Sequence, residues 1–237
     1  MATVAQIMAN AEAHTDLDVI AIADHDQVGG ALEAVEWCAG RPGERLQAIV
    51  ATEISMAWGR HLLALFFAPP YPTRPLPRFR SLRTTLQMVA EAGGIGVVPH
   101  PLSPLVPSLG EGTLNQHLAG SASCLHALEA CSGVVGGRRA EARIRRLNHA
   151  AWGLALLGNS DAHHLCQIGS SYTCFSGRTP QELRAAIEAR TTVARWGTPA
   201  SVSLPSHLRQ NWLSLFVKPV RELRAAARAL AAPALPA

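Results

Sequence analysis

Lysine is nearly absent from this chain, long apolar runs and a basic N-terminal segment are missing, and each of these features narrows the possible classes of protein. Lys218 is the only lysine among 237 residues, and charged residues make up just 16% of the sequence. No apolar run approaches the roughly 20 residues that a membrane-spanning helix needs. Residues 1–11 lack the basic start and the apolar stretch of a signal peptide. We therefore expect a soluble, cytoplasmic protein without a membrane partner.

The cysteine and glycine patterns count against further classes of protein. The five cysteines are an odd number and show no Cys-x-x-Cys spacing, which argues against a disulfide framework or a zinc ribbon. The glycine pairs at 29–30 and 93–94 do not form the glycine-rich first turn of a doubly wound, nucleotide-binding sheet. There is no P-loop either. These absences favour a β/α barrel over a doubly wound sheet.

Composition predicts one folded domain. The chain is 48% hydrophobic, which suffices for one sizeable core, and we expect this domain to cover residues 1–200. Residues 201–237 are predicted to form a C-terminal helical tail. The net charge of +4 mildly favours anionic ligands. Five arginines between 138 and 146 form either a solvated helix face or a phosphate-attracting rim, and the first interpretation is the more ordinary one.

Short apolar runs that end at a histidine or an acid are the most informative feature. The runs at 18–23, 46–52, 94–99 and 154–160 have the length and branching of buried strands, and they alternate with predicted helices. This alternation predicts an α/β fold with a mainly parallel sheet. In a β/α barrel the carboxyl ends of the strands converge on one face, where the chemistry takes place. Imidazole and carboxylate groups that meet there can bind divalent metal ions.

Three of the candidate ligands lie in the first third of the chain. His25 lies between two acids, which is typical either of a helix-capping turn or of a metal ligand whose ring an acid orients. Glu53 follows an apolar run, and its burial is costly unless it pairs with a group or binds a cation. His61 begins its run instead of ending it, so its position alone leaves its role open.

The remaining candidates lie in the second half. His100 stands between two prolines, which stiffen the backbone around it. Asp161 and His163 are two residues apart, so in extended backbone their side chains would point the same way. The candidate metal ligands are therefore His25, Glu53, His61, His100, Asp161 and His163, and the candidate catalytic residues are Glu53, Asp161 and His163.

Taken in order, these motifs resemble the PHP family (polymerase and histidinol phosphatase). The resemblance covers roughly residues 1–200 and rests on Asp24-His25-Asp26, Glu53, His61-Leu62-Leu63, Pro99-His100-Pro101 and Gly158-Asn159-Ser160-Asp161-Ala162-His163. It implies a distorted (β/α)7 TIM-like barrel that cleaves phosphoesters with one to three divalent metal ions (Zn, Mn or Fe).

The resemblance also implies a role for each ligand. Glu53 would bridge two metals, of which one is completed by His61 and His100 and the other is shared with Asp161. His25 and His163 would hold a third metal. A hydroxide that bridges two of these ions would attack phosphorus.

The sequence departs from the family pattern at its start. The family opens with a strand that carries His-x-His and with a Ser-Asp-Gly turn, and neither is present here. By this alignment the barrel lacks its first strand and the ligands on it. One interpretation is that Met1 is an internal methionine of a longer, fully active protein; the other is that the chain is this short and its catalysis is impaired. Exposed sheet edges are a structural liability, which favours the first interpretation.

Three hypotheses about function follow. The leading one is a metal-dependent phosphoesterase that hydrolyses phosphate esters of nucleotides or short oligonucleotides, like a 3′,5′-nucleotide bisphosphate phosphatase or a 5′–3′ exonuclease. The second is a non-catalytic, truncated PHP module that binds metal or phosphate. The third is an amidohydrolase-type barrel that cleaves C–N bonds. Such barrels usually use a lysine as a bridging ligand, and the solitary Lys218 in the tail counts against this class. No protein partner can be inferred from the sequence.

Overall fold

The structure is a computed structural model that describes residues 2–104, 106–119 and 125–198. Its main elements are α1 (Val4–His14), β1 (Val19–His25), α2 (Gly29–Ala39), β2 (Gln47–Ser55), β3 (His61–Phe66), α3 (Leu82–Glu91), β4 (Ile95–Val98), α4 (Glu111–Leu118), β5 (Leu125–Ser132), α5 (Gly137–Leu147), β6 (Ala155–Asn159), β7 (Ser171–Cys174), α6 (Pro180–Glu188) and β8 (Val193–Trp196). The predicted tail over 201–237 lies outside the described residues.

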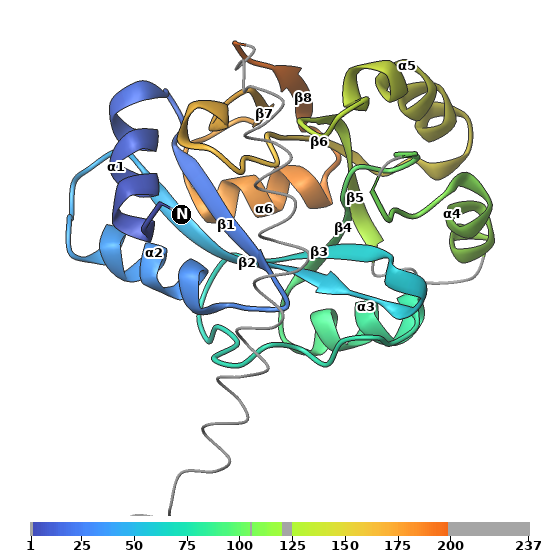
Figure 1. The fold of residues 1–237 in the computed structure, drawn as a ribbon, viewed down its shortest axis with the longest axis horizontal. Helices are drawn as coiled ribbons and strands as arrows, with labels where there is room; N and C mark the ends of the chain where they lie inside the picture. Colours follow the sequence, from blue (N-terminus) through green and yellow to red (C-terminus); the bar gives the residue numbers. More distant parts are fainter. Residues whose placement is uncertain (1, 105, 120–124, 199–237) are drawn as a thin grey trace, which may run out of the picture. The chain divides into compact units, whose positions relative to one another are not determined.

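The strands form a curled half-barrel (Figure 1). Six of them make one sheet in the order β1-β2-β3-β4-β5-β6, and β7 and β8 form a separate two-stranded sheet. The predicted α/β class is confirmed. A seven-stranded β/α barrel is not confirmed, because the described strands form this six-stranded sheet and the separate pair. Strand β1 is at a sheet edge, and on the face that it shares with His25 it exposes Ala21 and Ala23.

The prediction of a mainly parallel sheet needs correction at β3. This strand runs antiparallel to both β2 and β4, whereas the pairs β1–β2, β4–β5 and β5–β6 are parallel. The physical reason is the short connection over residues 56–60. A parallel crossover needs a dozen or more residues, so a link of this length permits only an antiparallel neighbour. The first residue of β3 therefore lies at the same edge as the last residues of β2.

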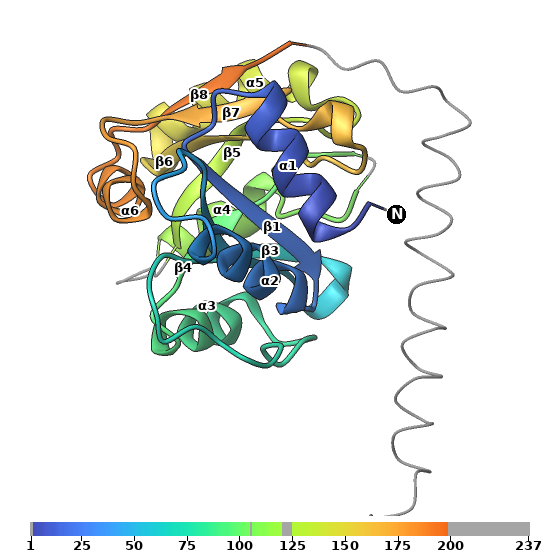
Figure 2. The same cartoon turned by 90° about the vertical axis from the view of Figure 1, so that its left-hand side faces the viewer.

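Two apolar layers hold the sheet in place. On one face, helices α2, α3, α4 and α5 pack against residues such as Val50, Leu62 and Leu128. Helices α1 and α2 also lie together beside the edge strand β1, as Figure 2 shows. The other face carries a second cluster, here called the inner cluster, to which α6 contributes Ile187. Its members are Ile49, Ala51, Leu63, Leu65, Phe67, Ile95, Val97, Ala127, Ala155, Leu157 and Ile187.

A local sequence signal fixes the start of α6. Thr179 caps α6 and accepts a hydrogen bond from the Glu182 N–H, while the Glu182 side chain accepts from the Thr179 N–H, which is the predicted capping box. Helix α4 and strands β7 and β8 were not predicted from the sequence. No helix in the described part of the chain combines the length and the apolar character needed to cross a bilayer.

Candidate metal centre

Sheet register brings three of the candidate ligands to one face of the sheet. His25 at the end of β1 is the register partner of Glu53 on β2, and His61 at the start of β3 is the partner of Ser55. Register partners project to the same face, and Glu53 and Ser55, two apart on one strand, do so as well. The same face carries Ala51 of the inner cluster, so the three side chains lie at the carboxyl edge of that apolar layer.

The Glu53 carboxylate is the point on which the imidazoles converge. Its Oε1 lies 2.9 Å from Nδ1 of His61 and 3.2 Å from Nε2 of His100. Its Oε2 lies 3.6 Å from Nε2 of His25. The His25 and His61 rings meet edge to face with centroids 4.8 Å apart, and the His61 and His100 rings do so at 5.7 Å. Four of the six candidate ligands therefore form one cluster in space.

The cluster is buried on one side and open on the other. The side chain of His100 is 6% exposed and that of Glu53 is 12% exposed, whereas that of His25 is 51% exposed. A ligand that approaches from solvent therefore reaches His25 first and His100 last.

The electrostatics of Glu53 and His100 reflect this closeness. Burial alone would raise the pKa of Glu53, but the hydrogen bond from His100, the close contact with His61 and the charge of His25 outweigh it and lower the pKa. Burial would lower the pKa of His100, but its bond to Glu53 and the nearby charge of Glu129 raise the pKa instead. The cluster thus favours an ionised carboxylate among imidazoles.

Asp161 and His163 adjoin this cluster. Burial, followed by the charge of Glu53, raises the pKa of Asp161, while the nearby His163, His100 and His25 oppose this rise. His163 Nδ1 lies 2.9 Å from the carbonyl oxygen of Asp161 and 3.9 Å from its Oδ1. The backbone here is not extended as predicted, since Asp161 has φ of 44°. Among the six candidates in the described chain, His163 makes its close contacts with Asp161 alone.

Glu129 is a site residue that sequence reasoning missed. It is fully buried on β5, where its Oε2 accepts the backbone N–H of His100 at 2.8 Å and its Oε1 accepts the side-chain amide of Asn159 at 2.6 Å. Burial raises the pKa of Glu129 to about 7, against the opposing effects of His100 and Asn159. The signal was present in the sequence: Glu129 is an acid inside the apolar run that predicts β5, two residues after the inner-cluster residue Ala127.

Asp26 joins the ends of two strands, which is neither of the roles predicted for the acids beside His25, a helix cap or a group that orients the His25 ring. It does not cap α2, whose N-cap is Val28 without a side-chain hydrogen bond. Its Oδ1 accepts the backbone N–H of Ser55 at 2.8 Å, and its own N–H donates to the Glu53 carbonyl. Asp26 therefore fastens the end of β1 to the end of β2 and fixes the relative positions of His25 and Glu53.

The residues present fit a divalent metal ion. Ligand atoms of His25, Glu53 and His61 all lie within 4.8 Å of one another. Zinc–nitrogen bonds of about 2.1 Å imply neighbouring ligand atoms about 3 to 3.5 Å apart, which matches the observed contacts to Glu53. Nδ1 of His61 is buried and, although close to Glu53, is not aligned for a hydrogen bond. An imidazole nitrogen left in this state beside a carboxylate suits a metal ligand.

Comparisons with known proteins match parts of this chain. The family model for the PHP-associated domain matches residues 142–192. The protein MJ1587 of Methanocaldococcus jannaschii, described as uncharacterized, is 26% identical over 104 residues, which are 44% of this chain and 56% of that protein.

Solved structures share the fold. A two-domain protein from Bacteroides vulgatus, containing a predicted PHP-like metal-dependent phosphoesterase, aligns with a TM-score of 0.57 and 20% identity over 80% of this chain and 59% of that one. The lesion-specific endonuclease PfuEndoQ from Pyrococcus furiosus aligns with a TM-score of 0.52 and 17% identity over 77% of this chain and 50% of that one. The present chain thus spans little more than half the length of these relatives. The family-model match over residues 142–192 supports the resemblance to the PHP family, and the solved structures show that the fold is shared.

Proposed function

We propose that this chain is a metal-dependent phosphoesterase that hydrolyses phosphate esters of nucleotides or short oligonucleotides. The observation that carries the proposal is the convergence of three imidazoles on the single carboxylate of Glu53, at the edge of the sheet where the strands β1 and β2 end. The endonuclease among the structural relatives agrees with this class of substrate.

Each ligand has a proposed role. His61, His100 and Glu53 would hold one ion, Glu53 and Asp161 would hold another, and His25 with His163 would hold a third. Bound Zn, Mn or Fe ions would supply charge neutralisation at the phosphoryl oxygens and would lower the pKa of a coordinated water. The protein contributes the positioning: Glu129 fixes the backbone of His100.

Two exposed aromatic side chains beside the centre favour nucleotides over other phosphoesters. Trp58 is 92% exposed and Phe79 is 64% exposed. Trp58 lies in the link between β2 and β3, three residues before His61, and the Phe79 N–H donates to the Ser55 carbonyl at 2.7 Å. Both have positive φ, at 64° and 60°, which is unusual for bulky residues and often marks functional sites. Exposed rings of this kind stack on nucleobases.

Positive charge next to these two aromatic residues fits the proposal. The guanidinium of Arg78 lies 3.7 Å from Oδ2 of Asp26 and 5.4 Å from the centre of the Phe79 ring. Arg60 follows Trp58 in the link between β2 and β3, and Arg80 follows Phe79. The Arg60 carbonyl accepts the N–H of Met56, and the Arg80 carbonyl accepts the N–H of Ala57. Cations beside exposed rings are the combination that single-stranded nucleic acids bind.

The test is hydrolysis by the full chain with and without divalent metal. Phosphomonoesters of nucleotides should be cleaved in the presence of Mn or Zn and not after chelation. Asp161→Asn should abolish this turnover, whereas Glu182→Gln, which alters only the cap of α6, should retain it. Full activity of Asp161→Asn would show that the site is wrongly placed, and cleavage of cyclic amides would favour the amidohydrolase alternative.

A second candidate is a non-catalytic module that binds metal or phosphate. One group of three candidate ligands among the described residues, His25, Glu53 and His61, has atoms within 4.8 Å of one another, which is enough to bind a single ion and favours this candidate. Metal content separates the two functions. Two or more ions per chain together with turnover support the phosphoesterase, and one ion or none without turnover supports the module.

A further inference from the structure

Two of the candidate ligands, His100 and Asp161, lie on backbone that side-chain-bearing residues rarely adopt. Their φ angles are 30° and 44°. A residue other than glycine keeps a positive φ only where the surrounding structure holds it in place. The groups that hold these two backbone positions therefore determine where both ligands lie.

The buried carboxylate of Glu129 holds the first of the two positions. Its Oε2 accepts the backbone N–H of His100 at 2.8 Å. Its Oε1 accepts the side-chain amide of Asn159 at 2.6 Å. Both oxygens act as acceptors, as those of an ionised carboxylate do.

Asn159 extends the connection to the second position. An asparagine side chain carries a donor and an acceptor, so it can bond to a carboxylate and to an N–H group at once. While its amide nitrogen donates to Glu129, its Oδ1 accepts the backbone N–H of Asp161 at 3.2 Å. A continuous chain of three hydrogen bonds therefore joins the backbone of His100 to that of Asp161.

Strand register explains why the two side chains meet. Glu129 on β5 is the register partner of Leu157 on β6, which belongs to the inner cluster. Asn159 lies two residues after Leu157, so it projects to the same face of the sheet. Between Glu129 and Cys131 the register shifts by a β-bulge, and bulges redirect side chains. The pair therefore lies at the carboxyl edge of the inner cluster, where the candidate ligands also lie.

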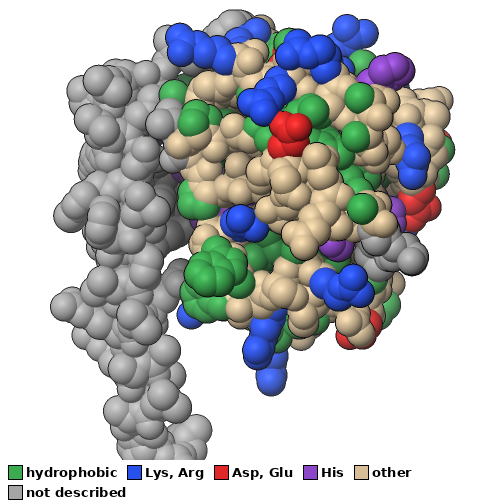
Figure 3. Space-filling view, turned by 90° about the vertical axis from the view of Figure 1, so that its right-hand side faces the viewer, with side chains coloured by type: hydrophobic (Ala, Val, Ile, Leu, Met, Phe, Trp, Pro, Cys, Tyr) green, Lys and Arg blue, Asp and Glu red, His purple; other side chains and the backbone are tan. Residues whose placement is uncertain are grey.

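Glu129 depends on these hydrogen bonds because no arginine or lysine of the described chain forms an ion pair with it. The arginines of the neighbouring helix α5 are engaged elsewhere: Arg143 pairs with Glu111. Arg145 pairs with Glu141. On the face of the molecule that carries α4 and α5, Lys and Arg side chains are spread over the surface (Figure 3). A buried carboxylate without a cation needs N–H donors, so the loss of either partner is costly.

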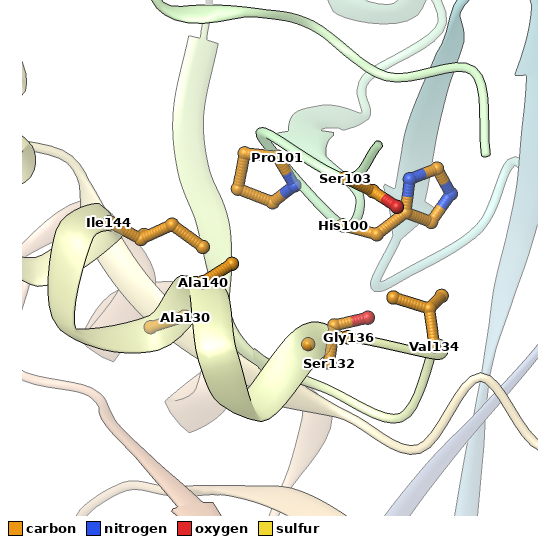
Figure 4. Close-up of a pocket in the computed structure, with 10 residues that line it drawn as sticks. His100, Pro101, Ser103, Ala130, Ser132, Val134, Gly136, Ala140 and Ile144 are labelled. Atoms are coloured by element: carbon orange, nitrogen blue, oxygen red, sulfur yellow. The ribbon is translucent and has the colours of Figure 1, made fainter. Parts of the chain in front are cut away.

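Packing holds the His100 turn only in part. A small open space lies between this turn and the start of α5, lined among others by His100, Ser132 and Val134 (Figure 4). Side chains do not fill this side of the turn. The hydrogen bond from the His100 N–H to Glu129 therefore fixes the backbone there.

We propose that Glu129 and Asn159 are a positioning pair, which sets the separation of His100 and Asp161 and thereby the metal affinity of the centre. Neither residue acts as a ligand in this proposal. Each acts through the backbone of a residue that does. The inference rests on the metal centre of the proposed function, but it concerns the binding of metal alone and not the reaction.

The first test measures the affinity of the full chain for Mn by isothermal titration calorimetry. Asn159→Ala should bind Mn about tenfold more weakly than the wild type, the loss expected when a partner of a metal ligand is removed. The matched control is Asn148→Ala. The buried Asn148 side chain bonds to the N–H and the carbonyl of Leu154, both at 2.9 Å, just before β6 and so at its opposite end. This control should lower the melting temperature in chelator and leave the affinity for Mn unchanged.

The outcomes separate the pair from the proposed function. Equal affinity of Asn159→Ala and the wild type overturns the pair, even if phosphoesters are hydrolysed. Affinity that depends on Asn159 without any hydrolysis supports the pair and contradicts the phosphoesterase. Absence of Mn binding by the wild type overturns both.

The second test exchanges the two side-chain groups. Glu129→Gln alone sets an amide against the amide of Asn159, and Asn159→Asp alone sets two carboxylates against each other. The double variant keeps the net charge and restores every donor and acceptor, because the new amide donates to the new carboxylate. Each single variant should lose at least about tenfold in Mn affinity, and the double variant should return to within about threefold of the wild type. A double variant weaker than both single variants would overturn the pair.

Discussion

Replacing Glu53 with glutamine should remove the response of the protein to divalent metal while keeping the shape of the site. Glutamine has the same size as glutamate but is neutral, so it is a far weaker ligand for a cation. In the structure this carboxylate contacts three imidazoles, at 2.9, 3.2 and 3.6 Å. Every proposed ion except the one between His25 and His163 depends on it.

The size of the effect follows from linkage. A metal present at 100 times its dissociation constant stabilises the folded state by about 2.7 kcal/mol. For a domain of roughly 200 residues, each kcal/mol raises the melting temperature by about 2–4 °C, so the metal should raise it by about 5–11 °C. In Glu53→Gln the rise should fall below about 2 °C, because little binding remains at that concentration.

The assay is thermal melting of the full chain in chelator and in added Zn or Mn. Glu182→Gln is the matched control, since it makes the same chemical change in the capping box of α6. It should lower the melting temperature in both conditions and preserve the metal-dependent rise. A full rise in Glu53→Gln would refute the reasoning, because it would show that the ions bind elsewhere.

Two further predictions concern parts of the fold around the site. Burial would raise the pKa of Glu141, but hydrogen bonds from the Trp196 indole at 2.7 Å and from Arg145 at 2.8 Å lower it. The ionised Glu141 carboxylate therefore stabilises the folded state above the unfolded pKa of about 4.3, and this contribution is lost as the pH falls through the folded pKa. Melting curves should therefore show Glu141→Gln less stable than the wild type at pH 7 and equal to it at strongly acidic pH; a constant difference would contradict this. Trp58→Gly should leave the free energy of unfolding unchanged or raise it by up to about 1 kcal/mol in urea titrations, because it relieves a positive φ. The same variant should raise the KM for a dinucleotide substrate about tenfold, and an unchanged KM would exclude stacking on Trp58.

Sequence patterns identified candidate ligands that lie close together in the structure where a strand end carries them. Glu53 and His25 each follow or end an apolar run, and the sheet register places them as partners. His61 was ambiguous because it begins its strand. The antiparallel direction of β3 resolves this ambiguity, since it brings the start of that strand to the edge where β2 ends. The link of only five residues before His61 is enough to predict this antiparallel direction from the sequence.

Other features depend on contacts that periodicity does not reveal. The positive φ of Asp161 shows a local turn in place of the extended backbone that the prediction for Asp161 and His163 assumed. Glu129 lies within an apolar run, and its partners His100 and Asn159 are each about 30 residues away in the chain. Strands β7 and β8 are only four residues each and pair with one another, so they lack a long apolar pattern.

Anomalous diffraction from crystals grown with Mn or Zn tests the central claim most directly. The account predicts a peak about 2.0–2.2 Å from the Glu53 carboxylate and from the facing nitrogens of His61 and His100. A map without a peak at Glu53, obtained at a metal concentration that supports phosphoester hydrolysis, would contradict the account.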